Sequence, residues 1–394
     1  MELSRRVTAL AVSATLEVSN KAAEMRRRGI DVVGFGAGEP DFPTPEAIKA
    51  AGIAAIKAGH TGYAKPTHGI PEARAAVCEK FRRENQLSYT PDQVIVSVGG
   101  KEALFLACAA LLNPGDEAIL PVPYWVSFPE QIKLCEAKVV EIRPRGGDDL
   151  RLTPQQIAAA VTDKTRIVIF NSPSNPGGFA YSPEETRAIA AALSGRDLIV
   201  LSDEMYDQLR FGDRREHLSF AAVSDEWYAK TITFNAASKT HSMTGWRVGY
   251  AAGPVNIIKA MAKLQSHITS GSATFVQHAL VEALTGDQTH VEARRAEFER
   301  RGYHMHARLS ALAGVTCFKP SGAFYCFPNV SKTYPRLGVK GSREFCNLVL
   351  EQSHVALVPG IAFGSDDHVR LSFANDMRYI DRGLDRLEKV LGKA

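Results

Sequence analysis

The segment NAASKTHSMTGWRVGY, residues 235–250, places a lysine, Lys239, eight residues before an arginine, Arg247. Most lysines are solvated surface residues, and Lys239 could be one of them. It closely follows an apolar run, 231–234, that is typical of a buried strand. A lysine in a closed pocket beside a fixed arginine has a lowered pKa, and its neutral amine is a nucleophile toward aldehydes. Lys239 is therefore the candidate reactive amine.

Two further apolar runs end in polar side chains that a ligand could use. The run 198–202 leads directly into Asp203, and an acid at the end of a buried strand costs free energy unless something pairs with it. Asp203 would either cap the next helix or pair with a cationic ring nitrogen of a ligand. The run 166–170 leads into the loop NSPSNPGG, which is either simply rigid or a device that fixes one polar side chain, Asn175.

A fourth apolar run, 94–98, leads into Gly99, Gly100 and Lys101. Two glycines at a strand-to-helix turn expose backbone N–H groups at a helix N-terminus, where these groups and the helix dipole favour an anion such as phosphate. The segment is not a Walker A loop, which needs an earlier glycine and a following Ser or Thr. The alternative is an ordinary turn.

These candidates need a scaffold that brings the ends of the four runs together. Between residues 45 and 295, short apolar runs alternate with amphipathic segments such as 101–112, 153–161 and 182–193. Three expected helix starts carry N-cap signals, at Ser182, Thr153 and Thr44. The alternation predicts an α/β fold with a mostly parallel sheet flanked by helices. Ligands of such sheets bind beyond the carboxyl ends of the strands, so we expect the four sites to converge.

The domain organisation is predicted from length and pattern. The chain has 394 residues, of which 45% are hydrophobic, and this suits one large or two ordinary domains. After residue 295 a long charge-rich helix is expected over 291–312, followed by short extended runs and a helix near 343–353. We predict a large ligand-binding domain of residues 46–294 and a smaller α+β domain of residues 1–45 and 295–394.

Composition excludes several classes of function. The formal net charge of +4 and the absence of Lys/Arg runs argue against a nucleic-acid partner. No apolar run approaches a membrane span of about 20 residues, so we expect no membrane partner and a cytoplasmic location. The six cysteines are scattered without metal-ligand spacing, which favours free thiols and predicts no metal site.

One cofactor fits a reactive amine, a buried acid followed three residues later by Tyr206, a positioned asparagine, and a phosphate site at one end of the sheet. Pyridoxal phosphate binds a lysine through its aldehyde, a carboxylate through its pyridine nitrogen, and a helix terminus plus arginine through its phosphate. Lys239, Asp203 and Arg247 are the residue types that this cofactor requires.

The order of these sites resembles the class I aminotransferases of PLP fold type I, across nearly the whole chain. Within that family the sequence is most similar to the prokaryotic aspartate aminotransferases, including those that accept prephenate. The resemblance is carried by the following segments: 38–42 (GEPDF), Tyr63 with Gly69, 99–101 (GGK), 123–125 (PYW), 171–178, 202–206 (SDEMY), 238–249 and 369–372 (VRLS).

The resemblance implies a homodimer with shared active sites that moves an amino group from a dicarboxylic amino acid to a 2-oxo acid such as 2-oxoglutarate. It also implies a role for each matching residue. Those expected to bind the cofactor are Lys239 as Schiff-base lysine and proton carrier, Asp203 at the pyridine nitrogen, Asn175 and Tyr206 at the phenolic oxygen, Trp125 on the ring, and Gly100, Lys101, Arg247 and the partner subunit's Tyr63 at the phosphate.

The substrate is expected to meet a second set of residues. The resemblance places Arg370 and the backbone of Gly38 at its α-carboxylate, with Asn175 and Trp125 beside it. The distal carboxylate is expected to be read by Lys101 with help from Thr15.

Two positions depart from the family pattern. The usual Asn-Pro-Thr-Gly has Gly177 in place of threonine, which would loosen the loop, and Ala236 stands where a hydroxyl often touches the phosphate. The alternatives to a dicarboxylate transaminase are a lyase that eliminates a β or γ substituent, an aromatic or alanine-type aminotransferase, and a non-catalytic regulator with the same fold.

Overall fold

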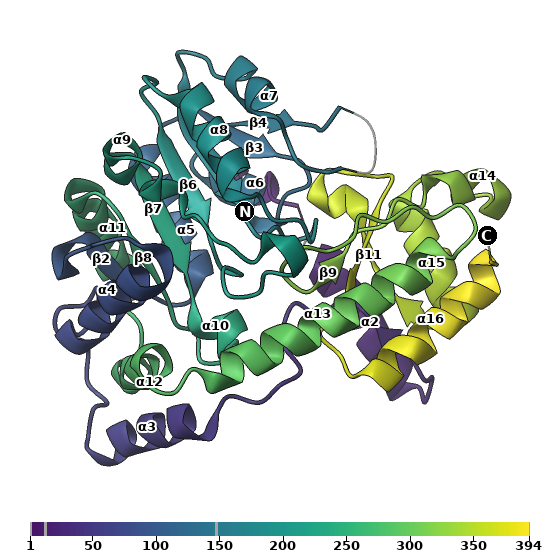
Figure 1. Cartoon of the computed structure of the whole chain (residues 1–394), viewed down its shortest axis with the longest axis horizontal. Helices are drawn as coiled ribbons and strands as arrows, with labels where there is room; N and C mark the ends of the chain where they lie inside the picture. The colour runs from purple at the N-terminus through teal and green to yellow at the C-terminus, as the bar shows by residue number, and fades with distance from the viewer. Residues whose placement is uncertain (1, 12–13, 146–148, 394) are drawn as a thin grey trace.

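The computed structural model describes residues 2–11, 14–145 and 149–393. Its centre is a seven-stranded sheet with the order β2-β8-β7-β6-β5-β3-β4 (Figure 1). The strands are β2 Val94–Ser97, β3 Glu117–Pro121, β4 Lys138–Ile142, β5 Thr165–Asn171, β6 Ile199–Asp203, β7 Thr231–Asn235 and β8 Gly249–Ala252. Only β8 is antiparallel to its neighbours, so the predicted mostly parallel α/β sheet is confirmed.

The alternation of side chains along the strands explains why both faces of this sheet are covered. In β5, Ile167 and Ile169 pack with α5 (Gly100–Leu111), α6 (Ser127–Leu134) and α11 (Val255–Ile268). Val168 and Phe170 pack on the opposite face with α8 (Pro183–Leu193). Successive strand residues point to opposite faces, so a run of branched and aromatic residues supplies two cores at once.

The bounds of the helices around the sheet are α3 Glu46–Lys57, α4 Pro71–Asn85, α5 Gly100–Leu111, α6 Ser127–Leu134, α7 Pro154–Ala159, α8 Pro183–Leu193, α9 Asp225–Ala229, α10 Ala237–Thr240, α11 Val255–Ile268 and α12 Thr274–Thr285. The helices α5 to α10 connect successive strands of the sheet, whereas α3 and α4 precede β2 and α11 and α12 follow β8. Short 3-10 turns lie at η1 Pro91–Gln93, η2 Gly212–Arg214 and η3 Phe220–Ala222.

Two small sheets lie beside the large one, built from both ends of the chain. β1 Val33–Gly34 pairs in parallel with β10 Val355–Ala356, and β12 Val369–Ser372 lies between β11 Val358–Pro359 and β9 Tyr325–Cys326. The remaining elements are α1 Arg5–Thr8, α2 Ala14–Arg27, α13 Thr289–Ser310, η4 Ser331–Thr333, α14 Tyr334–Leu337, α15 Ser342–Ser353, η5 Gly360–Phe363 and α16 Met377–Leu391. In Figure 1, α13 runs between the large sheet and these elements. The predicted boundary at residues 294 and 295 falls inside α13, and the domain division stays a prediction.

Two of the three N-cap predictions are confirmed. Ser182 and Thr153 each accept a hydrogen bond from the backbone of the third helical residue and complete a capping box. The prediction for Thr44 is wrong, because α3 begins after Pro45 without a side-chain cap. The Thr44 hydroxyl instead donates to the Ser242 carbonyl (2.6 Å) and accepts from the Trp246 indole (3.1 Å). A tertiary contact therefore replaces the local one.

Candidate functional site

The four strand ends predicted to converge lie on the same side of the large sheet, at the carboxyl ends of its parallel strands. β6 ends at Asp203, which is the register partner of Asn171 at the end of β5 and of Phe234 in β7. After β7 the chain turns directly into α10, which carries Lys239. After β2, Gly99 leads into α5. Because parallel strands share one direction, these four loops face the same space.

The Lys239 amine lies in an environment that disfavours its charge. Its Nζ donates a hydrogen bond to the carbonyl of Gly38, so Gly38 is brought to the site as predicted. Burial of the amine, followed by the positive charge of Arg370, lowers the pKa of Lys239 to about 8. A substantial fraction of the amine is therefore neutral near physiological pH, which is the state that attacks a carbonyl carbon.

Asp203 is a buried acid with 5% of its surface exposed. Its Oδ1 accepts a hydrogen bond from the Met205 backbone (3.2 Å). Burial is the main reason that the pKa of Asp203 rises to about 7, and the charge of the adjacent Glu204 raises it further. Such a carboxyl gains free energy from a cationic partner, so its setting suits the protonated nitrogen of a pyridine ring.

The N-terminus of α5 forms a cradle with Arg247. Gly99 has φ 76° and ψ 161°, a conformation that almost only glycine adopts. A Cβ on Gly99 would lie 2.7 Å from the Arg247 guanidinium, so the missing side chain lets the arginine reach the helix start. Gly249 of β8 lets the strand pass close to the start of α5, because a Cβ at this position would lie 2.3 Å from the Gly100 backbone nitrogen. Backbone N–H groups, a helix dipole and a guanidinium together make an anion site.

Arg370 of β12 comes from the far end of the chain and is only 2% exposed. Its guanidinium donates to the Asn175 side chain (3.0 Å) and to the Gly36 carbonyl (2.9 Å), while its buried Nε has no partner within the described structure. Burial lowers the pKa of Arg370. A buried guanidinium with neutral partners and one unused donor can receive a carboxylate.

Tyr206 comes three residues after Asp203 and has a partner that sequence reasoning missed. Its hydroxyl lies 3.0 Å from that of Tyr325 in β9, and burial together with this neighbour raises the pKa of Tyr206. Tyr325 also lies under the Arg370 guanidinium, 4.6 Å from ring centre to carbon. Tyr325 lies among the short extended runs expected between the helices at 291–312 and 343–353, and no local motif distinguishes it.

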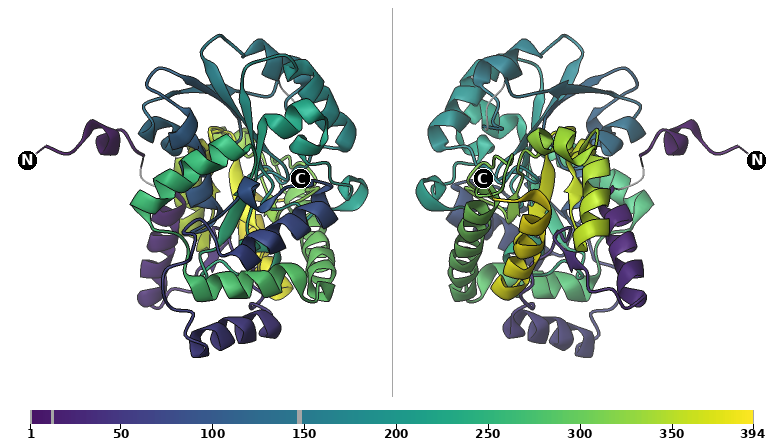
Figure 2. Two further views of the ribbon diagram at one scale, coloured as in Figure 1. Left: turned by 90° about the vertical axis from the view of Figure 1, so that its left-hand side faces the viewer. Right: turned by 90° about the vertical axis from the view of Figure 1, so that its right-hand side faces the viewer.

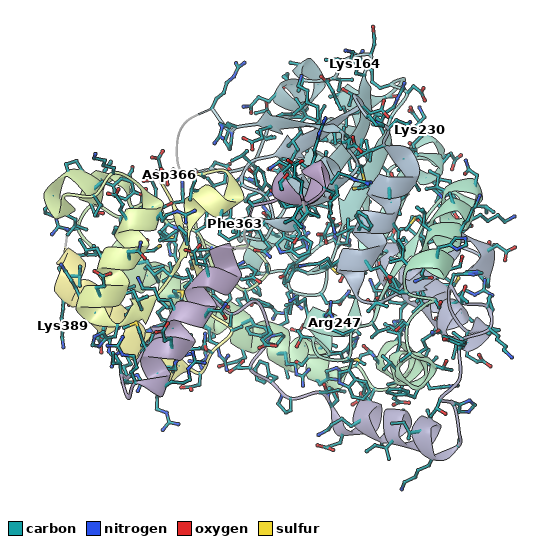
Figure 3. All side chains as sticks on the ribbon, turned by 180° about the vertical axis from the view of Figure 1, so that it is seen from behind. Lys164, Lys230, Arg247, Phe363, Asp366 and Lys389 are labelled. Atoms are coloured by element: carbon teal, nitrogen blue, oxygen red, sulfur yellow. The ribbon has the colours of Figure 1, made fainter. Side chains whose placement is uncertain are left out.

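Lys101 and Trp125 lie together at this edge. The Lys101 Nζ is 4.9 Å from the Trp125 ring centre, the geometry of a cation–π contact. Partial burial of the amine and the charge of Arg247 lower the pKa of Lys101. Figure 3 labels Arg247, and also Phe363, whose ring lies 5.0 Å from the Arg370 guanidinium.

Two predicted site residues are not brought to this cluster by their own chain. Tyr63 comes after α3 and is 81% exposed, and no hydrogen bond or ring contact joins it to the other candidates in the described residues. Thr15 falls in α2, but its side chain lies outside the described part of the structure.

The two departures from the family pattern have different settings. Gly177 is buried, and a Cβ there would meet the Phe179 ring at 2.4 Å, so the phenyl ring fills the space beside the loop. Ala236 is also buried, and its backbone donates to the Asn235 side chain (2.7 Å), while the neighbouring Ser238 is 7% exposed. The Asn175 loop therefore stays buried without a threonine at position 177.

The donor set of this cluster fits pyridoxal phosphate. The partly neutral lysine suits the aldehyde of the cofactor, and the buried acid suits its ring nitrogen. The anion cradle suits the phosphate, and the arginine with an unused donor suits the substrate carboxylate. No additional metal ligand is needed for any of these contacts.

Comparison with known proteins gives consistent results. The model of the family "Aminotransferase class I and II" matches residues 30–387. An aspartate aminotransferase of Bacillus sp. (strain YM-2) is 44% identical over 389 residues, 99% of each chain. An aspartate/prephenate aminotransferase of Thermus thermophilus is 43% identical over 395 residues, 100% of this chain and 99% of the relative. A solved structure of Thermus thermophilus aspartate aminotransferase with maleate superposes with a TM-score of 0.93 at 42% identity, covering 99% of this chain and 100% of the other.

Proposed function

Because the chain belongs to the aminotransferase class I and II family, we propose that it moves the amino group of aspartate or glutamate to a 2-oxo acid such as 2-oxoglutarate. The reaction is a pyridoxal phosphate-dependent transamination in which amino donor and acceptor react in turn. Relatives named aspartate aminotransferase and aspartate/prephenate aminotransferase support a dicarboxylic substrate, and prephenate is proposed as a further acceptor.

The observation that carries the proposal is that Lys239 and Asp203 lie at the same end of the sheet, where burial shifts the pKa of each side chain toward its neutral form. When bound, pyridoxal phosphate supplies the electron sink that accepts the electron pair released at the substrate Cα. Lys239 Nζ is proposed to hold the cofactor covalently and then to carry the proton that leaves Cα. Asp203 is proposed to stabilise the positive charge on the pyridine nitrogen.

The other residues orient and bind. Arg247 with the backbone of Gly100 and Lys101 is proposed to hold the phosphate, and Arg370 to bind the substrate α-carboxylate through its Nε and its fork of nitrogens. Asn175, which already accepts a hydrogen bond from Arg370, keeps that guanidinium in place (3.0 Å). Tyr206 and Asn175 are proposed to hydrogen-bond the phenolic oxygen, and Trp125 to cover the ring.

Selection of a second carboxylate is assigned to Lys101, assisted by Thr15. Arg370 is committed to the α-carboxylate, and the Lys101 amine lies over Trp125 at the same edge. Its position one residue after the phosphate-binding glycines lets the backbone serve the cofactor while the ammonium serves the substrate.

The working unit is proposed to be a homodimer with shared active sites. The support is the high exposure of Tyr63, the residue assigned to the partner's phosphate site. A cytoplasmic location is proposed as well. Its support is that the six cysteines are all free, and in the part of the chain described no helix has the length and apolarity to cross a bilayer.

Half-reactions test the proposed function. Purified protein with bound pyridoxal phosphate and aspartate alone should accumulate pyridoxamine phosphate and oxaloacetate, seen by absorbance and product analysis. Lys239→Ala should lose nearly all of this turnover and still fold. With an amino acid that carries a β leaving group, such as cysteine, release of ammonia with pyruvate would instead identify the lyase alternative. A pyridoxyl group trapped by borohydride on another lysine would refute the assignment of Lys239.

A second experiment tests the substrate class. Loss of one charged contact in a partly hydrated site reduces transition-state stabilisation by roughly 1.5–3 kcal/mol, which lowers kcat/KM about ten- to a hundredfold. Lys101→Ala should lose that factor for aspartate, glutamate and prephenate and leave alanine and phenylalanine nearly unaffected. Equal losses for both groups would show that Lys101 serves only the phosphate.

A further inference from the structure

Tyr325 of β9 lies between two residues that the proposed function uses, although it has no role there itself. Its side chain is buried. Its hydroxyl is 3.0 Å from the hydroxyl of Tyr206, and its ring centre is 4.6 Å from the guanidinium carbon of Arg370. Among the described residues, the Tyr325 hydroxyl has no other hydrogen-bond partner. Both of its contacts therefore lead to the site.

Backbone hydrogen bonds hold the two tyrosines together. The N–H of Ala323, two residues before Tyr325, donates to the carbonyl of Leu209 (2.9 Å), and the N–H of Leu209 donates to the carbonyl of Tyr206 (2.8 Å). The Tyr325 hydroxyl is also bounded by Gly38, where a Cβ would lie 3.4 Å from it. The contact between the hydroxyls is therefore set by the pairing of two main-chain segments.

The register between β9 and β12 places a positive charge over the Tyr325 ring. Tyr325 pairs with Ser372, so Arg370, two residues earlier, is its diagonal neighbour on the same face of the small sheet. Burial raises the pKa of Tyr325, and the charge of Arg370 opposes this rise. At Tyr206, burial and the neighbouring Tyr325 both raise the pKa and outweigh the charge of Arg370. Tyr325 is therefore the more acidic hydroxyl of the pair and the better hydrogen-bond donor.

The number of available protons indicates the same direction of donation. A tyrosine hydroxyl carries one proton, and its oxygen can also accept a hydrogen bond. If Tyr206 donates its proton to the phenolic oxygen of the cofactor, that proton is not available to Tyr325. The proton in the 3.0 Å contact must then come from Tyr325.

We propose that Tyr325 is a positioning residue for this reaction, whose hydroxyl donates to Tyr206 and so directs the Tyr206 proton onto the phenolic oxygen of the cofactor. This rests on the role of Tyr206 in the proposed function. Hydrogen bonds in a chain polarise one another, which strengthens each by about 10–30%. Tyr325 thereby stabilises negative charge on the phenolic oxygen without contacting the cofactor.

The effect should appear in the pKa of the covalent linkage between Lys239 and the cofactor. The linkage nitrogen and the phenolic oxygen of pyridoxal phosphate share one proton, so loss of that proton leaves the oxygen with its full negative charge. A donor to the oxygen stabilises this charge and lowers the pKa of the linkage. Removal of the Tyr325 hydroxyl weakens the donor and should therefore raise that pKa.

Other ionisable groups act on the same space and stay unchanged in the variants that test Tyr325. They are Asp203 from β6, Lys239 from α10, Arg370 from β12, Arg247 and Glu39.

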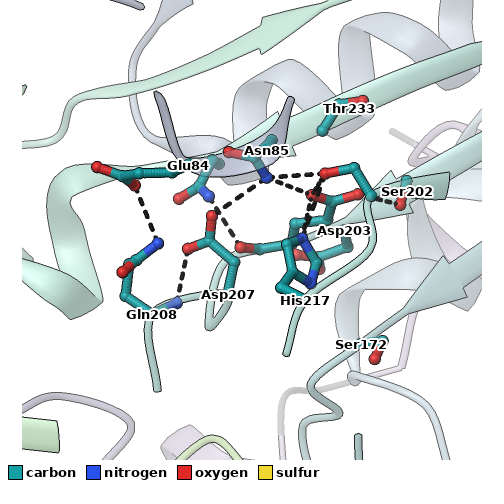
Figure 4. Close-up of polar contacts among 12 residues, drawn as sticks. Glu84, Asn85, Ser172, Ser202, Asp203, Asp207, Gln208, His217 and Thr233 are labelled. Carbon is teal, nitrogen blue, oxygen red and sulfur yellow. Dashed lines mark hydrogen bonds and ion pairs between the residues drawn. The ribbon is translucent and has the colours of Figure 1, made fainter. Parts of the chain in front are cut away.

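Glu204, the residue after Asp203, belongs to a separate network. Its Oε2 accepts hydrogen bonds from Asn85 (2.9 Å) and Ser219 (2.6 Å) and lies 2.9 Å from His217 Nε2. Figure 4 shows Asn85 and His217 in this network, beside Asp203. These contacts do not involve either tyrosine of the proposed chain of hydrogen bonds.

The test is a spectroscopic pH titration of the enzyme loaded with pyridoxal phosphate, without substrate. The visible absorbance band reports the protonated linkage. Tyr325→Phe keeps the ring under Arg370 and removes only the hydroxyl, and it should raise the midpoint by about half a pH unit, a roughly threefold gain in proton affinity. Tyr206→Phe should raise it further, and the double variant should match Tyr206→Phe alone.

The matched control is Tyr334→Phe. Tyr334 is a buried tyrosine of the same half of the chain, and its hydroxyl donates to the Asp366 carbonyl (2.6 Å). Its substitution should leave the midpoint unchanged. An equal shift in Tyr334→Phe and Tyr325→Phe would indicate general loosening of the packing and would overturn the proposal.

The remaining outcomes separate this inference from the proposed function. An unchanged or lowered midpoint in Tyr325→Phe, with the expected rise in Tyr206→Phe, overturns the inference alone. A double variant whose shift is the sum of the two single shifts also overturns it, because Tyr325 would then act independently of Tyr206. An unchanged midpoint in Tyr206→Phe overturns the role assigned to Tyr206 in the proposed function, and this inference with it.

Discussion

Lys239 and Asp203 are each held in a setting that favours the neutral form of the side chain. The lysine loses hydration and lies near Arg370, and the acid loses hydration near Glu204. Both costs are removed when a group arrives that binds the amine covalently and offers a cationic nitrogen to the acid. The pocket is therefore prepared for a cofactor by the same burial that destabilises it without one.

The lowered pKa of Lys239 predicts how cofactor capture depends on pH. Only the neutral amine attacks the aldehyde, so the rate should rise with pH and level off above the pKa of about 8, rather than near the ordinary value of 10.5. Mixing cofactor-free protein with pyridoxal phosphate and following absorbance measures this rate. Arg370→Met removes the charge that lowers the pKa and should move the midpoint upward. A wild-type midpoint near 10.5 would contradict the buried setting.

The raised pKa of Asp203 predicts a pH-dependent effect on stability. The carboxyl has a pKa of 3.8 when unfolded and about 7 when folded, so the folded state binds more protons between these values and loses stability as pH rises through them. Asp203→Asn should therefore raise the unfolding free energy of the cofactor-free protein above pH 7 by up to about 4 kcal/mol, with little effect below the unfolded pKa.

Urea unfolding of the cofactor-free Asp203→Asn variant at both ends of this range checks the prediction. The same variant should gain less stability than wild type when pyridoxal phosphate is added, because the asparagine carries no charge for the ring nitrogen. A destabilised cofactor-free variant at alkaline pH would contradict the assignment of an unpaired acid.

At the scale of elements, the anion cradle proposed to hold the phosphate depends on two glycines in neighbouring segments. Gly99 adopts a conformation closed to other residues, and Gly249 lets β8 pass close under the first turn of α5. Both make room for backbone atoms and for Arg247. The anion site is thus a property of how α5 and β8 pack, with side-chain charge added by one arginine.

Gly99→Ala should weaken the cradle. The backbone conformation would cost about 1–3 kcal/mol for alanine, and the added Cβ would displace the Arg247 guanidinium. We expect affinity for pyridoxal phosphate to fall by about tenfold or more, measured by equilibrium binding. Gly245→Ala is the matched control in the Arg247 segment, because nothing lies within 4 Å of its Cβ position. Equal affinities in both variants would show that Arg247 does not hold the phosphate.

At the scale of the whole molecule, α13 connects the large sheet to the small ones. It has 22 residues and is about 33 Å long. Near its start His290 contacts His241 beside the Lys239 turn, and near its end Arg308 pairs with Asp385 of α16. Arg370 reaches Asn175 across the same junction. The site is therefore assembled from both halves of the chain.

Exposed apolar side chains on and after α3 form the face that we expect the partner subunit of the proposed dimer to cover. Ile53, Ile56 and Tyr63 are 54%, 49% and 81% exposed on α3 and the segment after it. That segment is fastened to the rest of the molecule by the hydrogen bond from Thr274 to Gly62 (2.6 Å). The apolar N-terminal residue Val7 is also exposed, on α1, which projects from the body in both views of Figure 2.

The variant Ile53→Glu with Ile56→Glu should therefore dissociate the proposed dimer. Burying two unpaired charges should weaken association by about a hundredfold or more, seen as a concentration-dependent monomer by light scattering. Activity should fall with it, since the partner's Tyr63 is lost from the phosphate site. Val255→Glu, at another exposed apolar residue, is the control. A wild-type chain that is monomeric and fully active would refute the dimer.

Local sequence was sufficient to identify the strand ends and the polar residues just beyond them. Lys239, Asp203, Asn175 and Gly99 were identified because each comes soon after an apolar run, and the direction of a buried strand and the turn after it depend on nearby residues. The family resemblance added Arg370 and the role expected of Tyr206, and the family itself is shown by the matching family model and relatives.

The packing of distant segments determines which of these side chains touch and which residues support them. Thr44 was predicted to cap a helix, but its hydroxyl instead contacts Ser242 and Trp246, about 200 residues away in the chain. Tyr325 behind Tyr206, and Asn85 and His217 around Glu204, carry no local signal either. Hydrogen bonds of this kind join positions far apart in the chain, and a polar side chain takes whichever partner the packed backbone brings within about 3 Å. Local pattern therefore predicts where a functional residue stands, whereas its charge state and partners are set by tertiary packing.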